Sequence, residues 1–344
     1  TMRMTKIIIC KYFILNNLWL IIANIKKPTK GGKRKTPFFR FCYISNMKKL
    51  ILVFLFSPLI ILAQPNIGAK NVDRNVIYGM YSGLALLMDV HYPLFSNGIG
   101  LVHVSGSGFN RPLSLSSKPL NHQGHVKLEC EKLLKNGYTI FTINHRATPR
   151  FKFPAAIEDA QRAVRFIRYT SSKFNINPNK IGAIGGSSGG NIVLMLGLLD
   201  GKGNNRDIDP INRESAKVQA VIARAPVTTF LIKDSYNNSV YLGARGKEME
   251  IVNSSEYNIA KNASPVSHVS KGDPPVLLMH GDKDKTVPIL HSKILIDSLE
   301  KYGIKNELIV IKDAGHGPSF RGGLNISNID SLRIDWFNKY LLLK

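Results

Sequence analysis

The residues best suited to covalent chemistry lie in a glycine-rich run, GGSSGGN, at 185–191. The run fits the pattern G-x-S-x-G, in which small residues two positions before and after a serine let the chain close tightly around it. The pattern fits twice, with either Ser187 or Ser188 at its centre. We favour Ser187 as the nucleophile, because the apolar strand expected at 180–184 ends beside the run and brings this residue to the strand tip.

A serine hydroxyl is a weak nucleophile unless a base removes its proton and a third group orients that base. Two later segments supply both groups, each directly after an apolar run typical of a strand. The run at 276–279 leads into Asp282 and Asp284, and the run at 308–311 leads into His316. We expect His316 to be the base and Asp284 its orienting acid. Asp282 is the alternative acid, although an aspartate at this position is more typical of one that shapes a turn.

Glycine-rich turns also bind phosphate, so a phosphate-binding loop is the alternative to a nucleophile. A Walker loop requires Gly-Lys-Ser/Thr, which the run lacks, and a dinucleotide fingerprint normally occupies the first strand-to-helix turn of a domain. The cysteines predict no internal disulfide, zinc cluster or CxxC redox pair, because Cys10 and Cys42 precede the expected domain and leave Cys130 alone. We therefore expect chemistry that requires no metal and no cofactor.

Strand and helix patterns alternate from residue 76 to the C-terminus. Apolar strands separated by helices predict an α/β fold with a mostly parallel sheet covered on both faces. The polar segment 228–274 interrupts the alternation, and an insertion at this place is expected to cover the ligand crevice as a small cap. The expected strands are two within 76–92 around Ser82-Gly83, then 100–104, 138–144, 180–184, 218–223, 275–280 and 308–311; the expected helices are 125–135, 154–170, 190–199, 291–302 and 331–343.

The composition is that of a globular protein, with 344 residues of which 44% are hydrophobic, so disordered and collagen-like classes are excluded. The net charge of +24 is misleading, because residues 1–63 carry twelve Lys and Arg and no Asp or Glu. The remainder has no basic stripe interleaved with aromatic residues, so we expect no nucleic-acid partner.

A secretory signal peptide is predicted at 47–63. Met47-Lys48-Lys49 precedes 13 mostly apolar residues and then Ala63, after which we expect cleavage. The apolar run is shorter than the roughly 20 residues that cross a bilayer, so we expect no stable membrane insertion. The mature chain, 64–344, is expected to be an exported single domain, either periplasmic or extracellular. Residues 1–46 are interpreted as translated sequence upstream of the true start at Met47; an N-terminal membrane anchor is the alternative.

From about Val76 onwards the chain resembles the α/β-hydrolase esterases and lipases, close to the feruloyl- and acetyl-esterase-like and hormone-sensitive-lipase types. The run at 185–190 is similar to the family's G-x-S-A-G-G elbow, and the family's order of serine, acid and histidine is also present. The segments NHR at 144–146 and KFPAAIED at 152–159 are similar to a Tyr-Arg…Phe-Pro-Ala…Asp stretch of the family. Its approach to the catalytic acid is matched by ASP at 263–265, DPPV at 273–276 and HGDKD at 280–284, which supports Asp284.

One departure from the family concerns the oxyanion hole, the set of N–H donors that stabilises the negative oxygen of an acyl-transfer intermediate. The family usually carries His-Gly-Gly-Gly followed by an aromatic residue, where this chain has SGSGF at 105–109. Because backbone N–H groups supply the donors, we expect Ser107, Gly108 and Ser188 to form the hole.

The resemblance implies a serine esterase that cleaves carboxylic esters through an acyl-enzyme, and the predicted signal peptide implies that the enzyme is exported. Together they favour short-chain or carbohydrate-linked acetyl or feruloyl esters as substrates. Two alternatives stay open at this point. A peptidase of the prolyl-oligopeptidase type shares the order of the triad, and a catalytically degenerate hydrolase fold would act as a binding protein.

Overall fold

The protein is described here from a computed structural model that covers residues 68–232, 239–243, 248–324 and 326–343. The predicted upstream segment 1–46 and signal peptide 47–63 lie outside the described residues. Within the part of the chain that is described, no helix is long and apolar enough to cross a membrane.

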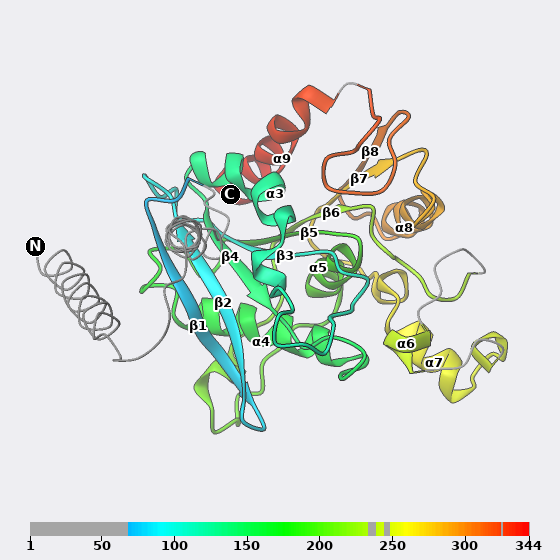
Figure 1. Cartoon of the computed structure of the whole chain (residues 1–344), viewed down its shortest axis with the longest axis horizontal. Helices are drawn as coiled ribbons and strands as arrows, with labels where there is room; N and C mark the ends of the chain where they lie inside the picture. The colour runs from blue at the N-terminus through cyan, green and yellow to red at the C-terminus, as the bar shows by residue number, and fades with distance from the viewer. Residues whose placement is uncertain (1–67, 233–238, 244–247, 325, 344) are drawn as a thin grey trace, which may run out of the picture. The chain divides into compact units, whose positions relative to one another are not determined.

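The described strands form one eight-stranded sheet in the order β1-β2-β4-β3-β5-β6-β7-β8 (Figure 1). The β1–β2 and β2–β4 pairs are antiparallel, and all other neighbours are parallel, which confirms the expected mostly parallel sheet. The strands are β1 (Asn71–Tyr81), β2 (Leu84–Tyr92), β3 (Gly100–Val104), β4 (Thr139–Asn144), β5 (Ile181–Gly186), β6 (Ala220–Arg224), β7 (Val276–Gly281) and β8 (Asn306–Ile311).

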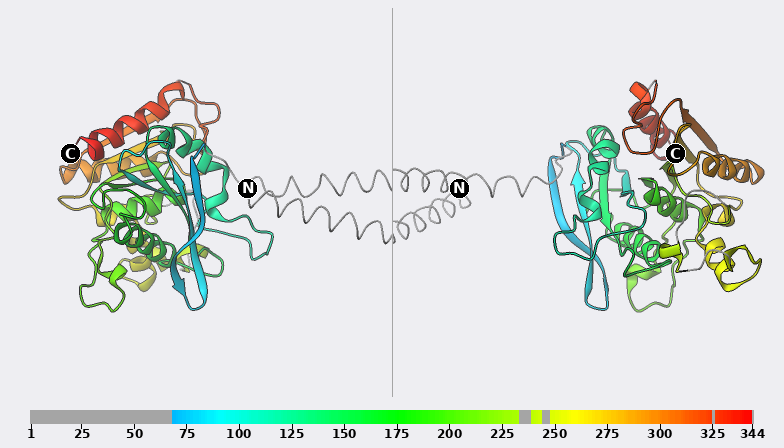
Figure 2. Two further views of the ribbon diagram at one scale, coloured as in Figure 1. Left: turned by 90° about the vertical axis from the view of Figure 1, so that its left-hand side faces the viewer. Right: turned by 45° about the vertical axis from the view of Figure 1, so that its right-hand side comes forward.

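Helices cover both faces of the sheet, so its central strands are buried throughout their length (Figures 1 and 2). One face packs against α4 (Ala155–Tyr169), α5 (Ser188–Leu198) and α8 (Leu290–Lys301), which share one apolar core. The other face packs against α3 (Gly124–Lys135) and α9 (Ile329–Phe337), which share a second core.

Several element boundaries differ from the sequence predictions. Strand β1 begins at Asn71 rather than 76, because its polar first residues pair with β2, starting with Asn71 opposite Tyr92. The last helix was expected to run over 331–343, but α9 ends at Phe337 and a π-helical turn, η7 (Asn338–Leu342), follows. Short 3₁₀ turns are η2 (Leu120–His122), η3 (Pro210–Arg213), η4 (Glu248–Glu250), η5 (Pro265–His268) and η6 (Ile326–Asn328).

The most consequential difference lies at the glycine-rich run. Strand β5 continues through Gly185 and Gly186, which pair with Ala223 and Arg224 of β6, and helix α5 begins at Ser188 rather than at 190. Glycines weaken a strand but do not prevent ladder hydrogen bonds, so a buried strand with a paired neighbour extends through them. A single residue, Ser187, therefore connects the strand to the helix.

The polar insertion forms two helices in its described part, α6 (Ser239–Leu242) and α7 (Ser255–Asn262). The ring of Tyr241 stacks on that of Phe109, with centroids 3.7 Å apart, and Phe230 lies beside both. Phe109 ends the predicted oxyanion loop, so the insertion packs directly against that loop. Tyr241 is buried and acts here as a packing residue.

Candidate active site

The turn at Ser187 has a backbone conformation that L-residues rarely adopt. Its φ is 55° and its ψ is −123°, outside the regions that a residue with a Cβ normally occupies. The Ser187 N–H donates to the carbonyl oxygen of Arg224, 2.8 Å away at the end of β6. Strained backbone of this kind persists only where its surroundings fix it, and it concentrates at functional sites.

The glycines around Ser187 are required by close backbone approaches. A Cβ on Gly189 would meet the carbonyl oxygen of Val104, and a Cβ on Gly185 would lie 2.7 Å from the carbonyl oxygen of Gly189. A Cβ on Gly106 would lie 2.7 Å from the carbonyl oxygen of Gly186. The oxyanion loop and the serine turn are therefore in contact through their backbones.

Three predicted side chains form a continuous line of hydrogen bonds. His316 Nε2 lies 3.0 Å from Ser187 Oγ, and His316 Nδ1 lies 2.6 Å from Asp284 Oδ2. Ser187 follows β5, Asp284 follows β7, and His316 follows β8. Because these strands are parallel, their carboxyl ends meet at one edge of the sheet, which explains how residues distant in sequence come together.

The acid of this line is ionised at neutral pH. Burial alone would raise the pKa of Asp284, but hydrogen bonds from His280, His316 and the Val287 N–H hold it well below its usual range. The backbone N–H groups of Thr286 and Val287 both donate to Asp284 Oδ1, at 2.9 Å. The carboxylate is therefore fixed in orientation as well as in charge.

Asp282, the alternative acid, and the nearby His280 take other positions. Asp282 does not reach the histidine; its Oδ1 accepts the backbone N–H of Asp313 at 2.7 Å and so fastens the loop that carries His316. His280 is buried, contacts Ser292 Oγ and the Val287 carbonyl, and lies 3.4 Å from Asp284 Oδ2. This contact with Asp284 was not predicted from the sequence.

The predicted oxyanion hole differs in one respect from expectation. Among the described residues, the backbone N–H groups of Gly108 and Ser188 have no acceptor and are open. The backbone N–H of Ser107 instead donates to Ser188 Oγ, 2.9 Å away. Two of the three expected donors are thus open, and the third is engaged by a side chain.

A buried group of charges beneath the turn was missed from the sequence. Arg224 Nε donates to Glu129 Oε1 at 2.8 Å, and His103 Nε2 lies 2.8 Å from Glu129 Oε2. The Arg224 guanidinium occupies the space that a Cβ on Gly186 would need. The available signal was the presence of His103 and Arg224 in otherwise apolar strands, and of Glu129 on the buried face of α3.

Opposing effects set the protonation of this glutamate. Burial alone would raise the pKa of Glu129, but the Arg224 guanidinium and the hydrogen bond from His103 hold it far below its ordinary value. Glu129 is therefore a buried carboxylate that balances a buried guanidinium directly under the candidate nucleophile.

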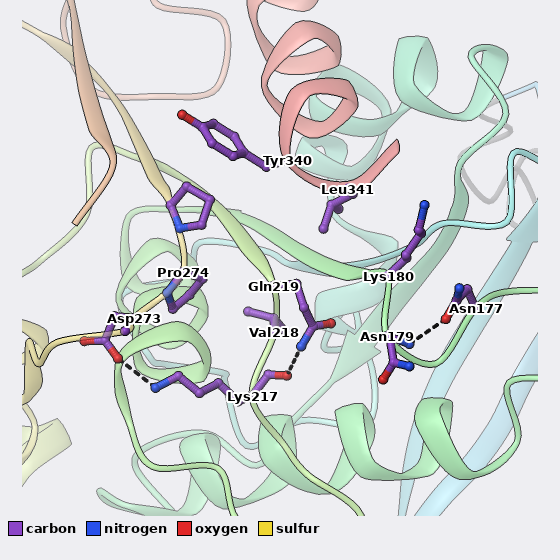
Figure 3. Close-up of a pocket in the computed structure, with 12 residues that line it drawn as sticks. Asn177, Asn179, Lys180, Lys217, Val218, Gln219, Asp273, Pro274, Tyr340 and Leu341 are labelled. Carbon is purple, nitrogen blue, oxygen red and sulfur yellow. Dashed lines mark hydrogen bonds and ion pairs between the residues drawn. The ribbon is translucent and has the colours of Figure 1, made fainter. Parts of the chain in front are cut away.

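A cavity of about 630 Å³ lies at the opposite edge of the sheet, where β5, β6 and β7 begin (Figure 3). Both lysines in its wall are already engaged: Lys217 Nζ pairs with Asp273 at 2.7 Å, and Lys180 Nζ donates to the Leu342 carbonyl.

Within the described residues, no group of three or more His, Cys, Asp or Glu side chains could hold a metal ion.

The strand order, the one-residue turn between β5 and α5, and the acid and histidine after β7 and β8 define an α/β-hydrolase fold. Residues 88–299 match the model of the BD-FAE family, which is more than half of the chain. The chain therefore belongs to the BD-FAE family, and the expected place among the α/β-hydrolase esterases is confirmed.

Two curated relatives are both proteins of Mycobacterium tuberculosis. The chain is 26% identical over 183 residues to the probable carboxylic ester hydrolase LipM, covering 53% of this chain and 42% of LipM. It is 28% identical over 175 residues to the esterase LipQ, covering 50% of this chain and 40% of LipQ. The matches thus span less than half the length of these relatives.

Solved structures share the fold at low identity. An acetyl ester-xyloside bifunctional hydrolase from Caldicellulosiruptor lactoaceticus superposes with a TM-score of 0.66 and 24% identity, covering 79% of this chain and 98% of that one. A truncated carbohydrate esterase from gut microbiota gives a TM-score of 0.67 with 23% identity, covering 81% of this chain and 99% of that one.

Removing the buried carboxylate should destabilise the protein. We expect Glu129→Gln to lower the free energy of unfolding by about 3–5 kcal/mol at pH 7, because Arg224 then stays buried without its counter-charge. Glu131→Gln on the same helix is the control, since Glu131 pairs with Lys135 in an i,i+4 surface pair that contributes little. Urea unfolding of the three proteins measures the difference.

The contribution of Glu129 to the free energy of unfolding should fall as the pH is lowered. A carboxylate whose pKa is lowered by folding stabilises the native state above its unfolded pKa, near 4.5 for Glu129, and this contribution is lost as the pH falls further. The gap in unfolding free energy between the parent and Glu129→Gln should therefore narrow below about pH 4.5. A gap independent of pH would contradict the assignment.

The turn at Ser187 should not tolerate a residue larger than glycine at position 189. We expect Gly189→Ala to lower the free energy of unfolding by about 1–3 kcal/mol, because the new methyl group would meet the backbone of Val104 and Ser105. Gly124→Ala is the matched control, since a Cβ there has no neighbour within 4 Å. Equal stability of both variants would refute the close approach.

Proposed function

We propose that the protein is a serine-dependent carboxylic ester hydrolase that acts through an acyl-enzyme. The observation that carries this proposal is the hydrogen-bonded line from Ser187 through His316 to Asp284 at the carboxyl edge of the sheet. Membership of the BD-FAE family and curated relatives that are named as esterases support it.

In the first half-reaction, Ser187 Oγ attacks the ester carbonyl carbon while His316 Nε2 takes the hydroxyl proton. Asp284 accepts the Nδ1–H hydrogen bond and stabilises the imidazolium that forms. The carbonyl π-electrons move onto oxygen, and the backbone N–H groups of Gly108 and Ser188 stabilise the resulting oxyanion. When the tetrahedral intermediate collapses, the bond to the alkoxy oxygen breaks and His316 protonates the departing alcohol.

In the second half-reaction, water replaces the alcohol. His316 removes a proton from water, the hydroxide oxygen bonds to the acyl carbon, and the bond to Ser187 Oγ breaks as the proton returns to that oxygen. The products are a carboxylic acid and free enzyme. Each step uses only residues of this chain, water and the ester.

For the substrate, we favour short-chain or carbohydrate-linked acyl esters. The support is the identity of the structural neighbours, an acetyl ester-xyloside bifunctional hydrolase and a carbohydrate esterase. Export is part of the same proposal and rests on the signal-like segment at 47–63. A polymeric carbohydrate ester outside the cell would be reached only by an exported enzyme.

The nucleophile is tested by assaying the full-length parent and Ser187→Ala on p-nitrophenyl acetate, butyrate and octanoate. We expect the variant to lose at least about 10³-fold in kcat, because no other group of the line can form the acyl-enzyme. A serine-directed phosphonate should label the parent and not the variant.

Each alternative predicts a different result when these assays are combined with a peptide-cleavage assay. A folded parent that neither turns over the esters nor reacts with the phosphonate would indicate a binding protein. A parent that cleaves an N-terminally blocked peptide faster than any ester would indicate a peptidase. An unchanged rate in Ser187→Ala would assign the nucleophile to another residue.

A further inference from the structure

The side chain of Ser188 has no role in the reaction described so far. It is the first residue of α5, directly after the candidate nucleophile, and its side chain is buried. Its Oγ accepts the backbone N–H of Ser107, 2.9 Å away. This bond joins two of the three residues expected to form the oxyanion hole.

The hydrogen of the Ser188 hydroxyl is not used in this arrangement. A serine hydroxyl has one O–H donor and two acceptor lone pairs, and the Ser107 N–H occupies one lone pair. Among the described residues, none accepts a hydrogen bond from Ser188 Oγ. Buried donors normally have a partner, so this hydrogen is available to a group that enters the site.

The place of Ser188 in the chain points to that group. Its backbone N–H follows the candidate nucleophile directly and is an expected oxyanion donor, and its Oγ lies at the contact between the turn at Ser187 and the oxyanion loop. A hydroxyl that already accepts a hydrogen bond is polarised and becomes a stronger donor. An expected backbone donor and a polarised O–H therefore belong to the same residue.

We propose that the Ser188 hydroxyl is a catalytic donor of the oxyanion hole, accepting the Ser107 N–H and donating its own hydrogen to the oxyanion of the ester hydrolysis proposed above. Ser188 transfers no proton and forms no covalent bond. In this arrangement the Ser107 N–H acts on the intermediate through Ser188, while Gly108 and the Ser188 backbone act directly.

A donor of this kind and a purely structural latch predict different kinetics. The full negative charge on oxygen exists only in the transition state and the intermediate, so loss of the donor lowers kcat with little change in KM. A latch that only fixes the loop at 105–109 would displace both the substrate and the Gly108 N–H when it is lost, so KM would rise together with any fall in kcat and in affinity for the charged intermediate.

The test compares Ser188→Ala with the full-length parent on p-nitrophenyl acetate. We expect kcat to fall about 100-fold with KM changed by less than about threefold, as for removal of other oxyanion donors. The affinity for an aryl trifluoromethyl ketone, whose hemiketal oxyanion mimics the intermediate, should fall in parallel with kcat/KM. Urea unfolding verifies that the variant remains folded.

Thr139→Val is the matched control. Thr139 begins β4 opposite Gly100, at the other edge of the sheet, and is buried like Ser188, but its Oγ1 has no hydrogen-bond partner among the described residues. Its removal should leave kcat and the ketone affinity within about twofold of the parent, since it lies away from the site.

An unchanged or higher kcat in Ser188→Ala would overturn the proposal, since the hydroxyl would then only occupy the Ser107 N–H. A KM raised by more than about threefold together with the fall in kcat would also overturn it in favour of a latch. The parent alone tests the esterase assignment: an inert parent overturns both proposals, whereas an active parent with an active Ser188→Ala overturns only this one.

Discussion

The single-residue turn at Ser187 is the constraint on which the rest of the site depends. A buried strand and a buried helix meet with one residue between them, and that residue must adopt a positive φ at a cost of about 1–3 kcal/mol. The cost is tolerated because the Ser187 N–H is held by the Arg224 carbonyl and because glycines let β3 and the oxyanion loop approach. The same turn sets the position of the hydroxyl that contacts His316.

Arg224 connects this turn to the stability of the whole domain. Its carbonyl oxygen holds the Ser187 backbone from β6, and its guanidinium fills the space beneath Gly186. Burying an ion pair is costly unless the ions are well paired, and here the two oxygens of Glu129 contact Arg224 Nε and His103 Nε2. One carboxylate of α3 thus connects β3 and β6 on either side of β5, and the strand that leads to the candidate nucleophile is fixed between them.

Much of this arrangement could be predicted from the sequence, for identifiable reasons. Buried parallel strands appear as continuous apolar runs, and their carboxyl ends share one edge, so Ser187, Asp284 and His316 were expected to lie together. The Arg224–Glu129–His103 group and the Ser188–Ser107 bond were not predicted, because side-chain contacts between distant residues leave no periodic signal. The start of α5 was misplaced because two glycines inside a buried strand were taken for a loop.

The structure positions Asp284 and His316 together, whereas it positions Ser187 separately. Asp282 fastens the His316 loop through the Asp313 N–H, and Gly281 lies so close to Ala314 that a side chain there would collide with its backbone. The loops after β7 and β8 are therefore locked to each other. Ser187 is fixed separately, through β5 and β6. The 3.0 Å contact between its Oγ and His316 Nε2 then depends on the register between β6 and β7, in which Arg224 lies opposite Met279.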